Sequence, residues 1–200
     1  MHMLGQRIMS VRVYSSHHGG WSDTVSLQHN DWVKMGNNAL VGNTLYFTCV
    51  RNTGILEYDW GKQELSIISV PSLCRDRPIP TMVMTLEDGG LGLSTVLNSK
   101  LYLWSREVGR DGWAQQRVID LNMLLPPPAL KLSPHVIAIS DGGGVILMKA
   151  DQGVFSIELK FNQVKELGSC SYVVPYTSVC TSVLVPAYEG EGPGVNAERA

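Results

Sequence analysis

The sequence predicts an all-β fold in which a unit of four antiparallel strands recurs along the chain. Helix signals are scarce: the one candidate, 120–125, meets three consecutive prolines at 126–128, and proline stops a helix. Elsewhere short apolar runs alternate with Gly, Asn, Asp and Pro, which is the pattern of strands joined by turns. The same order of strands and turns returns about every 45–50 residues.

The chain opens with two expected strands, 11–16 and 21–28, joined by a turn that contains His17 and His18. Three sets of four strands follow, and a proline-containing loop separates each set from the next. The first set is expected at 39–41, 44–50, 55–60 and 64–70. The second is expected at 81–86, 91–96, 101–107 and 113–121, and the third at 135–140, 145–150, 154–159 and 164–167.

Four strands repeated at this distance are typical of the blades of a β-propeller. One small sheet cannot bury both of its faces, whereas blades stacked around an axis cover one another. The Gly-His and Trp-Asp pairs of WD40 blades are missing, so the kelch type fits better. We therefore predict a kelch-like β-propeller with three full four-stranded blades and a partial blade. Tryptophans at the starts of fourth strands, Trp21 and Trp113, are expected to fill the space between blades.

A further apolar stretch follows Ser171, and it leaves two arrangements open. The stretch could supply the two strands that the partial blade lacks and so close a small ring. Alternatively, the chain belongs to a larger propeller. We favour an incomplete propeller, because a chain that enters in the middle of a blade is typical of a truncation.

The composition is that of an ordinary globular protein. Of the 200 residues, 44% are hydrophobic and 17% are charged, and the net charge is −2. Without a basic excess, neither nucleic acid nor an anionic membrane is expected as a partner. The sequence shows no secretory signal and no apolar run as long as a membrane span, so we expect an intracellular protein, cytoplasmic or nuclear. Cys49, Cys74, Cys170 and Cys180 lack zinc-site spacing and are expected to be reduced core residues.

Patterns that could carry chemistry are better explained as turns. Gly142, Gly143 and Gly144 lack the Gly-Lys-Ser/Thr ending of a phosphate-binding loop and lead into a strand, so a hairpin turn is expected there. His17 and His18 have no Cys, Asp or Glu cluster beside them that would complete a metal site. The G-x-S-x-G elbow of a serine nucleophile is missing. We therefore assign no catalytic, cofactor-binding or metal-binding residues.

Long loops are the better candidates, since recognition usually lies in loops on a rigid scaffold. In an up-and-down blade, the loop between strands two and three lies on the same face as the connections between blades. We call this the linker face; it carries 28–38, 51–54, 71–80, 97–100, 122–134 and 151–153. Its candidate partner-binding residues are Trp32, Lys34, Arg51, Arg75, Arg77, Lys100 and Lys131, against the acids Asp31, Asp76 and Asp151. The modest basic excess predicts an acidic or mixed protein epitope, although solvated loop charges explain it equally well.

Four phrases, taken in their order and spacing, carry a family resemblance. They are VYSSHHGGWS, VGNTLYFTCVRNTGILEYDWGKQELSIISVP, EDGGLGLSTVLNSKLYLWSREVGRDGWAQQRVIDLNMLLP and DQGVFSIELKFNQVKELGSCSYVVPYTS. Over roughly 11–182 the chain resembles the F-box-associated C-terminal domain of plant F-box proteins of the type common in grasses. In that family the domain is similar to a kelch-type propeller that recruits a target protein. A separate N-terminal F-box binds the Skp-type adaptor of a cullin ubiquitin ligase.

The resemblance implies an F-box-associated β-propeller region at 1–186 and a flexible C-terminal tail at 187–200. It implies a non-enzymatic module that recognises a target protein and needs no cofactor. The residues before Val11 are too few for a three-helix F-box, so an adaptor is expected as a partner only if an F-box lies upstream. Two alternatives stay open. One is a propeller enzyme of glycosidase or lactonase type, with Glu87, Asp88, Asp141 and Asp151 as the available acids; the other is a truncated gene product without independent activity.

Overall fold

A computed structural model of the chain describes residues 7–17, 19–75, 77, 79–107 and 112–169. The first four strands form one long antiparallel hairpin, which we call the half-blade. They are β1 (Ile8–Val11), β2 (Tyr14–Ser15), β3 (Gly20–Trp21) and β4 (Val25–Gln28). β1 pairs with β4 and β2 with β3, so the hairpin is interrupted once along its length.

Three four-stranded antiparallel sheets follow, and in each the strands pair in the order of the sequence. The first blade contains β5 (Val33–Val41), β6 (Thr44–Cys49), β7 (Ile55–Asp59) and β8 (Glu64–Ile68). The second contains β9 (Thr81–Thr85), β10 (Leu91–Leu97), β11 (Lys100–Arg106) and β12 (Trp113–Asp120). The third contains β13 (His135–Ile139), β14 (Val145–Ala150), β15 (Gly153–Glu158) and β16 (Gln163–Gly168).

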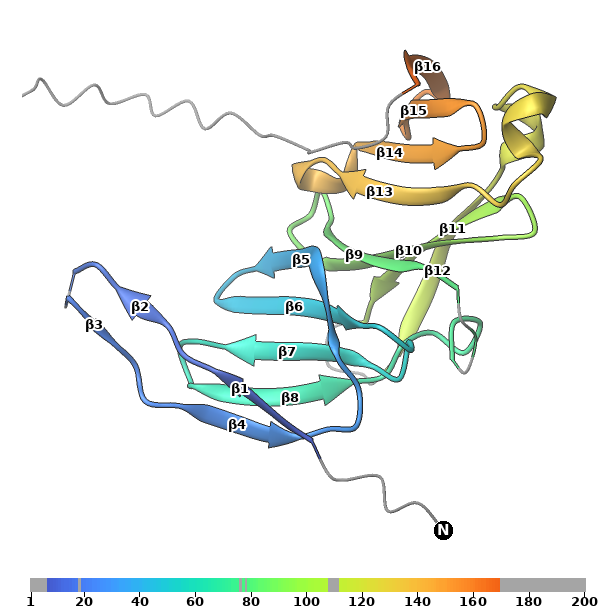
Figure 1. The fold of residues 1–200 in the computed structure, drawn as a ribbon. Coiled ribbons are helices and arrows are strands. Elements are labelled where there is room, and N and C mark those ends of the chain that lie inside the picture. The colour runs from blue at the N-terminus through green and yellow to red at the C-terminus, as the bar shows by residue number, and fades with distance from the viewer. Residues whose placement is uncertain (1–6, 18, 76, 78, 108–111, 170–200) are drawn as a thin grey trace, which may run out of the picture.

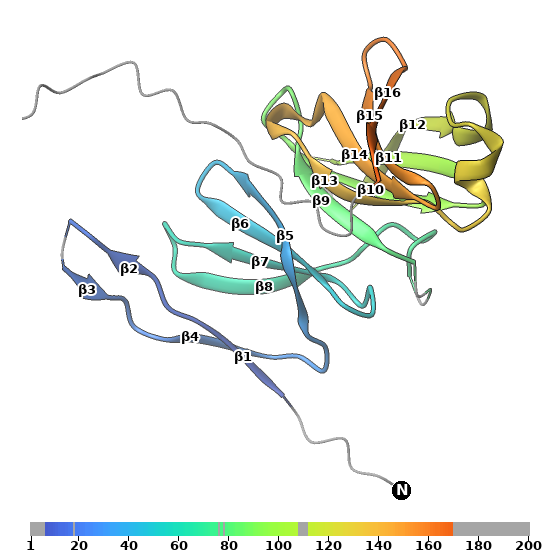
Figure 2. The ribbon, with the colours of Figure 1, turned by 45° about the horizontal axis from the view of Figure 1, so that its top comes forward.

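The sheets are arranged as the blades of an incomplete β-propeller, as predicted (Figure 1). The first strands of neighbouring blades touch, β5 against β9 and β9 against β13, so these strands lie innermost. On the other side of the first blade, β4 of the half-blade contacts β8. Figure 2 shows the half-blade and the third blade at opposite ends of this series, with the β2–β3 tip projecting beyond the first blade.

Two apolar cores lie between the blades. Between the first and second blades, Tyr46 and Ile55 pack with Leu93 and Trp104. Between the second and third blades, the larger core includes the fully buried Leu101. The second blade has a neighbour on each face, which explains why β10 is buried at six of its seven positions rather than at alternate ones. Trp104, with 4% of its surface exposed, and the partly buried Trp113 therefore pack between blades, as predicted for Trp113.

The prediction was wrong at the first strand of the first blade and at one tryptophan. β5 begins at Val33 rather than at 39. Its pairing with β6 shifts in register between Val33 and Asn38, so the strand includes residues that do not alternate between apolar and polar. Lys34 consequently lies on a strand and not in a loop. Trp21 is 62% exposed and contacts Tyr14 of its own hairpin, because the β2–β3 tip extends past the neighbouring blade.

The expected helix at 120–125 is a single 3₁₀ turn, η1 (Leu121–Met123), capped by the Asp120 carboxylate, which accepts a hydrogen bond of 3.0 Å from the Asn122 amide. Two more 3₁₀ turns are η2 (Pro127–Leu130) and η3 (Asp141–Gly143). None of the helices in the described ranges has the length and apolar character needed to cross a bilayer. Several predictions fall outside the described residues: those for His18, Asp76, Cys170, Cys180, the stretch after Ser171 and the 187–200 tail.

Candidate interaction surface

Asp31 joins two connections on the linker face. Its side chain is only 2% exposed, and its two oxygens accept hydrogen bonds from the Trp32 amide at 2.7 Å, the Arg51 amide at 3.0 Å and the Thr53 hydroxyl at 2.7 Å. Burial raises the pKa of Asp31, but hydrogen bonds from Thr53, Trp32 and Arg51 together hold the pKa below its usual value. His29 Nε2 lies 3.0 Å from the Thr53 hydroxyl. The carboxylate therefore fixes Trp32 and Arg51 relative to each other.

Asn52 joins the same loop to the connection between the first and second blades. It is 3% exposed, and its amide nitrogen donates to the carbonyls of Arg77, at 2.9 Å, and Ile79. The Thr81 hydroxyl donates to the Asn52 side-chain oxygen at 2.7 Å. The backbone of Asn52 has a φ of 56°, a left-handed conformation that asparagine tolerates better than most residues. Every polar atom of this buried side chain is thus used to hold two loops together.

These two buried side chains hold the backbones of Trp32, Arg51 and Arg77. Together with Arg7 and Arg75, these exposed residues form what we call the linker-face platform. Trp32 is 59% exposed, and the Arg7 guanidinium lies over its ring, 4.3 Å from the centroid. The three other arginines are exposed. The described residues of segments 28–38, 51–54 and 71–80 contain one carboxylate, the buried Asp31. The described residues of the platform are therefore basic, and they include an exposed indole that lies against the Arg7 guanidinium.

The other predicted linker-face residues lie elsewhere. Lys34 is half-buried on β5, and burial lowers its pKa. This residue lies on β5, one of the innermost strands. Lys100 is exposed at the start of β11, and Lys131 is exposed directly after η2. Asp151 is also exposed, and its backbone amide donates a hydrogen bond to the Ala129 carbonyl of η2. The structure thus links three of the seven predicted residues, Trp32, Arg51 and Arg77, through Asp31 and Asn52, and Arg75 lies on the same connection as Arg77.

An apolar cavity of about 630 Å³ adjoins the platform. It lies between β1 and the first blade, and Phe47 and Leu56 form part of its lining. Arg7 and Trp32 line it as well, so the cavity and the platform share an edge. Sequence reasoning missed Arg7 and this cavity, because it began the first strand at Val11 and counted charges only in loops.

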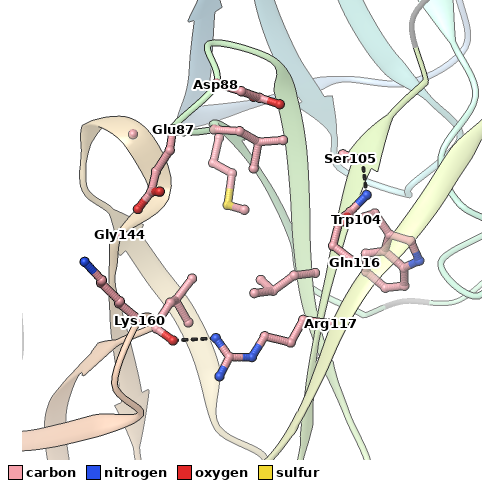
Figure 3. Close-up of a pocket in the computed structure, with 14 residues that line it drawn as sticks. Glu87, Asp88, Trp104, Ser105, Gln116, Arg117, Gly144 and Lys160 are labelled. Carbon is pink, nitrogen blue, oxygen red and sulfur yellow. Dashed lines mark hydrogen bonds between the residues drawn. The ribbon is translucent and has the colours of Figure 1, made fainter.

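A second cavity, of about 530 Å³, opens between the second and third blades on the face opposite the linker face (Figure 3). Arg117 of β12 crosses to the third blade, donating to the Leu159 carbonyl and, at 2.7 Å, to Asn162 Oδ1. Glu87 and Lys160 reach into the mouth of the cavity (Figure 3), but the Asp88 carboxylate accepts the Gly90 amide at 2.9 Å as a turn cap. Glu87 and Asp88 are neighbours on one turn, unlike the carboxylates of a glycosidase, which flank their substrate.

The three glycines at 142–144 form a turn as expected. Gly142 and Gly143 have φ values of 77° and 71°, which only glycine adopts without strain, and β14 follows directly. His17 is exposed near the hairpin tip. These positions bear out the interpretation of the glycine pattern as a turn, and His17 also lies in a turn, as expected.

One group of potential metal ligands was missed by sequence reasoning. Ligand atoms of His29, Asp31 and Cys49 lie within 4.8 Å of one another. The Thr53 hydroxyl lies among them and is hydrogen-bonded to His29 and Asp31, so the group is held by hydrogen bonds and serves the loop structure described above. In the sequence, the feature that could have indicated this group is the pair His29 and Asp31, with one residue between them.

Cys49 and Cys74 are free and buried, as predicted. Burial, and next the charge of Asp31, raises the pKa of the Cys49 thiol to about 11. Burial raises the pKa of Cys74 to about 12. Both side chains are therefore protonated at neutral pH and pack as small apolar groups.

A comparison with protein-family models gave no match, and a comparison with curated proteins gave none either. Among solved structures, the chain is similar to TolB from Acinetobacter baumannii, with a TM-score of 0.49 and 14% sequence identity. The match covers 82% of this chain and 38% of that chain, so this chain spans less than half the length of the TolB structure.

Proposed function

We propose that the protein is a non-enzymatic interaction module that binds a target protein through the linker-face platform. The observation that carries this proposal is the pair of buried polar side chains, Asp31 and Asn52, which tie together the backbones of the exposed Trp32, Arg51 and Arg77. Trp and Arg are the residue types most enriched at the energetic centres of protein interfaces. A platform that is already ordered loses little conformational entropy when it binds a partner.

The charge of the platform defines the partner's chemistry. Arg7, Arg51, Arg75 and Arg77 have exposed side chains, and Asp31, the carboxylate of these connections within the described residues, is buried and satisfied by three hydrogen bonds. Guanidinium groups bind carboxylates in a two-pronged geometry. The target therefore presents an acidic segment with an apolar residue that packs on Trp32.

The sequence resemblance supports a more specific role, in which the module recognises the substrate of an intracellular ubiquitin ligase of the Skp–cullin–F-box type. In that role the propeller contacts the target, and an F-box elsewhere in the protein contacts the adaptor. A pull-down of the 200-residue chain with a purified Skp-type adaptor is then expected to be negative. Adaptor binding by this chain alone would contradict the division of roles.

The platform can be tested by selecting ligands from a random peptide library displayed on phage. Selected peptides are expected to be enriched in Asp and Glu, and to bind the double variant Arg51→Glu, Arg75→Glu at least about tenfold more weakly, a change of about 1.4 kcal/mol. The matched control is Lys160→Glu, Lys165→Glu, which makes the same change of charge at exposed lysines of the third blade. Peptides without acidic enrichment, or equal losses in the two variants, would contradict the proposal.

A further inference from the structure

We infer that the target segment binds as an extended strand that adds to the inner edge of β1. This inference deepens the proposed function and rests on it, because it states how an acidic segment reaches the platform. It starts from the difference between the half-blade and the three complete blades. Within the described residues, the half-blade is two strands wide, and each complete blade is four strands wide.

β1 occupies the position of a third strand. Its partner β4 is the fourth strand, directly before the connection to the first blade, and β4 lies against β8, the fourth strand of that blade. In the complete blades the third strand also pairs with a second strand: β7 with β6, β11 with β10 and β15 with β14. On β1 the corresponding edge has no strand beside it among the described residues.

The register identifies the backbone groups on that edge. The His29 amide donates to the Arg7 carbonyl at 3.0 Å, so positions 7 and 29 form a hydrogen-bonded pair. Such pairs alternate along an antiparallel ladder, which makes Met9–Leu27 and Val11–Val25 the next ones. The N–H and C=O groups of Ile8 and Ser10 therefore point away from β4, toward the open edge.

The apolar cavity beside the platform lies along this edge. β1 lines it from Arg7 to Val11, and Phe47 of β6 and Leu56 of β7 belong to the facing blade. Met9 and Val11, the half-buried residues of β1, alternate with the exposed Ile8 and Ser10. A strand added beside β1 would place every second side chain in this cavity. In a complete blade, the buried face of the second strand occupies the corresponding position.

The positive charge of Arg7 at the start of β1 favours acidic residues at one end of the added strand. All strand pairs within the blades are antiparallel, so the carboxyl end of an added strand would lie beside the start of β1. Arg7 lies there with its guanidinium over Trp32, and the Trp32 and Arg51 amides are tied to the same Asp31 carboxylate. The preferred ligand is therefore an extended segment of alternating apolar residues that ends in acidic residues.

The test uses a labelled peptide, LGLSTVLEE, which joins the sequence of β10, a second strand of this protein, to two glutamates. Ser10→Pro removes the amide that points to the inner edge of β1. Ser26→Pro is the matched control, because it removes the amide on the outer edge of β4, directly opposite. Both variants lose the same hydrogen bond, the one of 2.9 Å between the Ser10 and Ser26 hydroxyls. Proline at such positions leaves the β1–β4 ladder intact.

Ser10→Pro is expected to weaken peptide binding by about tenfold or more, and Ser26→Pro by less than about twofold. In the wild-type protein, hydrogen exchange of the Ile8 and Ser10 amides should slow when the peptide binds, which tests the edge even if a proline variant does not fold. Equal binding by both variants, or unchanged exchange, overturns strand addition. Slow hydrogen exchange of the Ser10 amide in the absence of peptide would also overturn strand addition by a target, since a second copy or another segment then occupies the edge. If the binding of acidic peptides requires Arg51 and Arg75 but not the Ser10 amide, strand addition is wrong and the proposed function still holds.

Discussion

The half-blade and the second blade are made of similar strands, yet they lie in different environments. β10 is buried at six of its seven positions, whereas none of the four half-blade strands contains a buried residue. Trp104 in the second blade is 4% exposed, and Trp21 in the half-blade is 62% exposed. The second blade is covered on both faces, and the half-blade meets a neighbour through β4.

The comparison shows that burial in this fold comes from the neighbouring blade and not from the strand itself. A strand in the middle of the series contributes to two interfaces, and a strand at the end contributes to one. Stability is then close to a sum of interfaces between neighbours, as in repeat proteins. The half-blade belongs to the least stable part of the molecule and has the most surface left for a partner.

The largest effect should come from a buried leucine of the second blade. Leu101→Ala removes a fully buried side chain from the core between the second and third blades, and such changes cost about 2–5 kcal/mol. Leu27→Ala, at a half-buried position of β4, should cost about 1 kcal/mol. Urea unfolding of both variants measures the difference. Equal losses would mean that the half-blade is as well packed as the complete blades.

The next effect concerns Asn52, which links the first blade to the second. Asn52→Ala removes the hydrogen bonds from the Asn52 amide to two carbonyls and the bond from the Thr81 hydroxyl, for a loss of about 2–3 kcal/mol in the free energy of unfolding. Asn98→Ala is the matched control, since Asn98 is exposed and has a similar φ of 51°. The difference between the two variants isolates the buried hydrogen bonds from the backbone effect. A loss in Asn98→Ala as large as in Asn52→Ala would assign the role to the backbone alone.

The blades could be predicted because their signals are local. β14 was expected at 145–150 and is found there, since a turn of three glycines precedes an apolar run. Strand period and turn residues depend on neighbours in the sequence, which a single sequence displays. The start of β5 could not be predicted in the same way, because the register break between Val33 and Asn38 is set by pairing with β6.

The candidate site was predictable in part. Trp32, Arg51, Arg75 and Arg77 were expected on one face from strand topology alone, because alternating strand directions assign every loop to a face. The roles of Asp31 and Asn52 depend on partners 22 and 29 positions away, Thr53 and Thr81 respectively. Nothing near either residue in the sequence indicates that it is buried. A loop charge and a buried organising carboxylate look the same until the fold brings their partners together.

A smaller effect is expected from one of the hydrogen bonds that join the first and second blades. The Trp113 indole donates to the Ser69 carbonyl at 2.7 Å, from the second blade to the end of the first. Trp113→Phe keeps most of the apolar contact and removes this bond, which should cost about 1 kcal/mol. Trp60→Phe, at a tryptophan that is 37% exposed, should be nearly neutral. If both variants unfold at the same urea concentration, the Trp113–Ser69 hydrogen bond does not contribute to holding the two blades together.

The smallest effect is a pH dependence at the innermost strands. Burial, and then the charges of Lys149 and Lys34, lowers the pKa of His135 below its usual 6.5. The unfolded chain then binds this proton more readily than the folded chain, so stability is lost as the pH falls below about 6.5 toward the folded-state pKa. His135→Gln should flatten this part of the stability profile, and Lys34→Met should flatten it less. Identical profiles for wild type and His135→Gln in urea melts at pH 7.5 and 5.5 would contradict a lowered pKa for His135 in the folded chain, whereas an unchanged profile in Lys34→Met alone would assign the lowering to burial and Lys149.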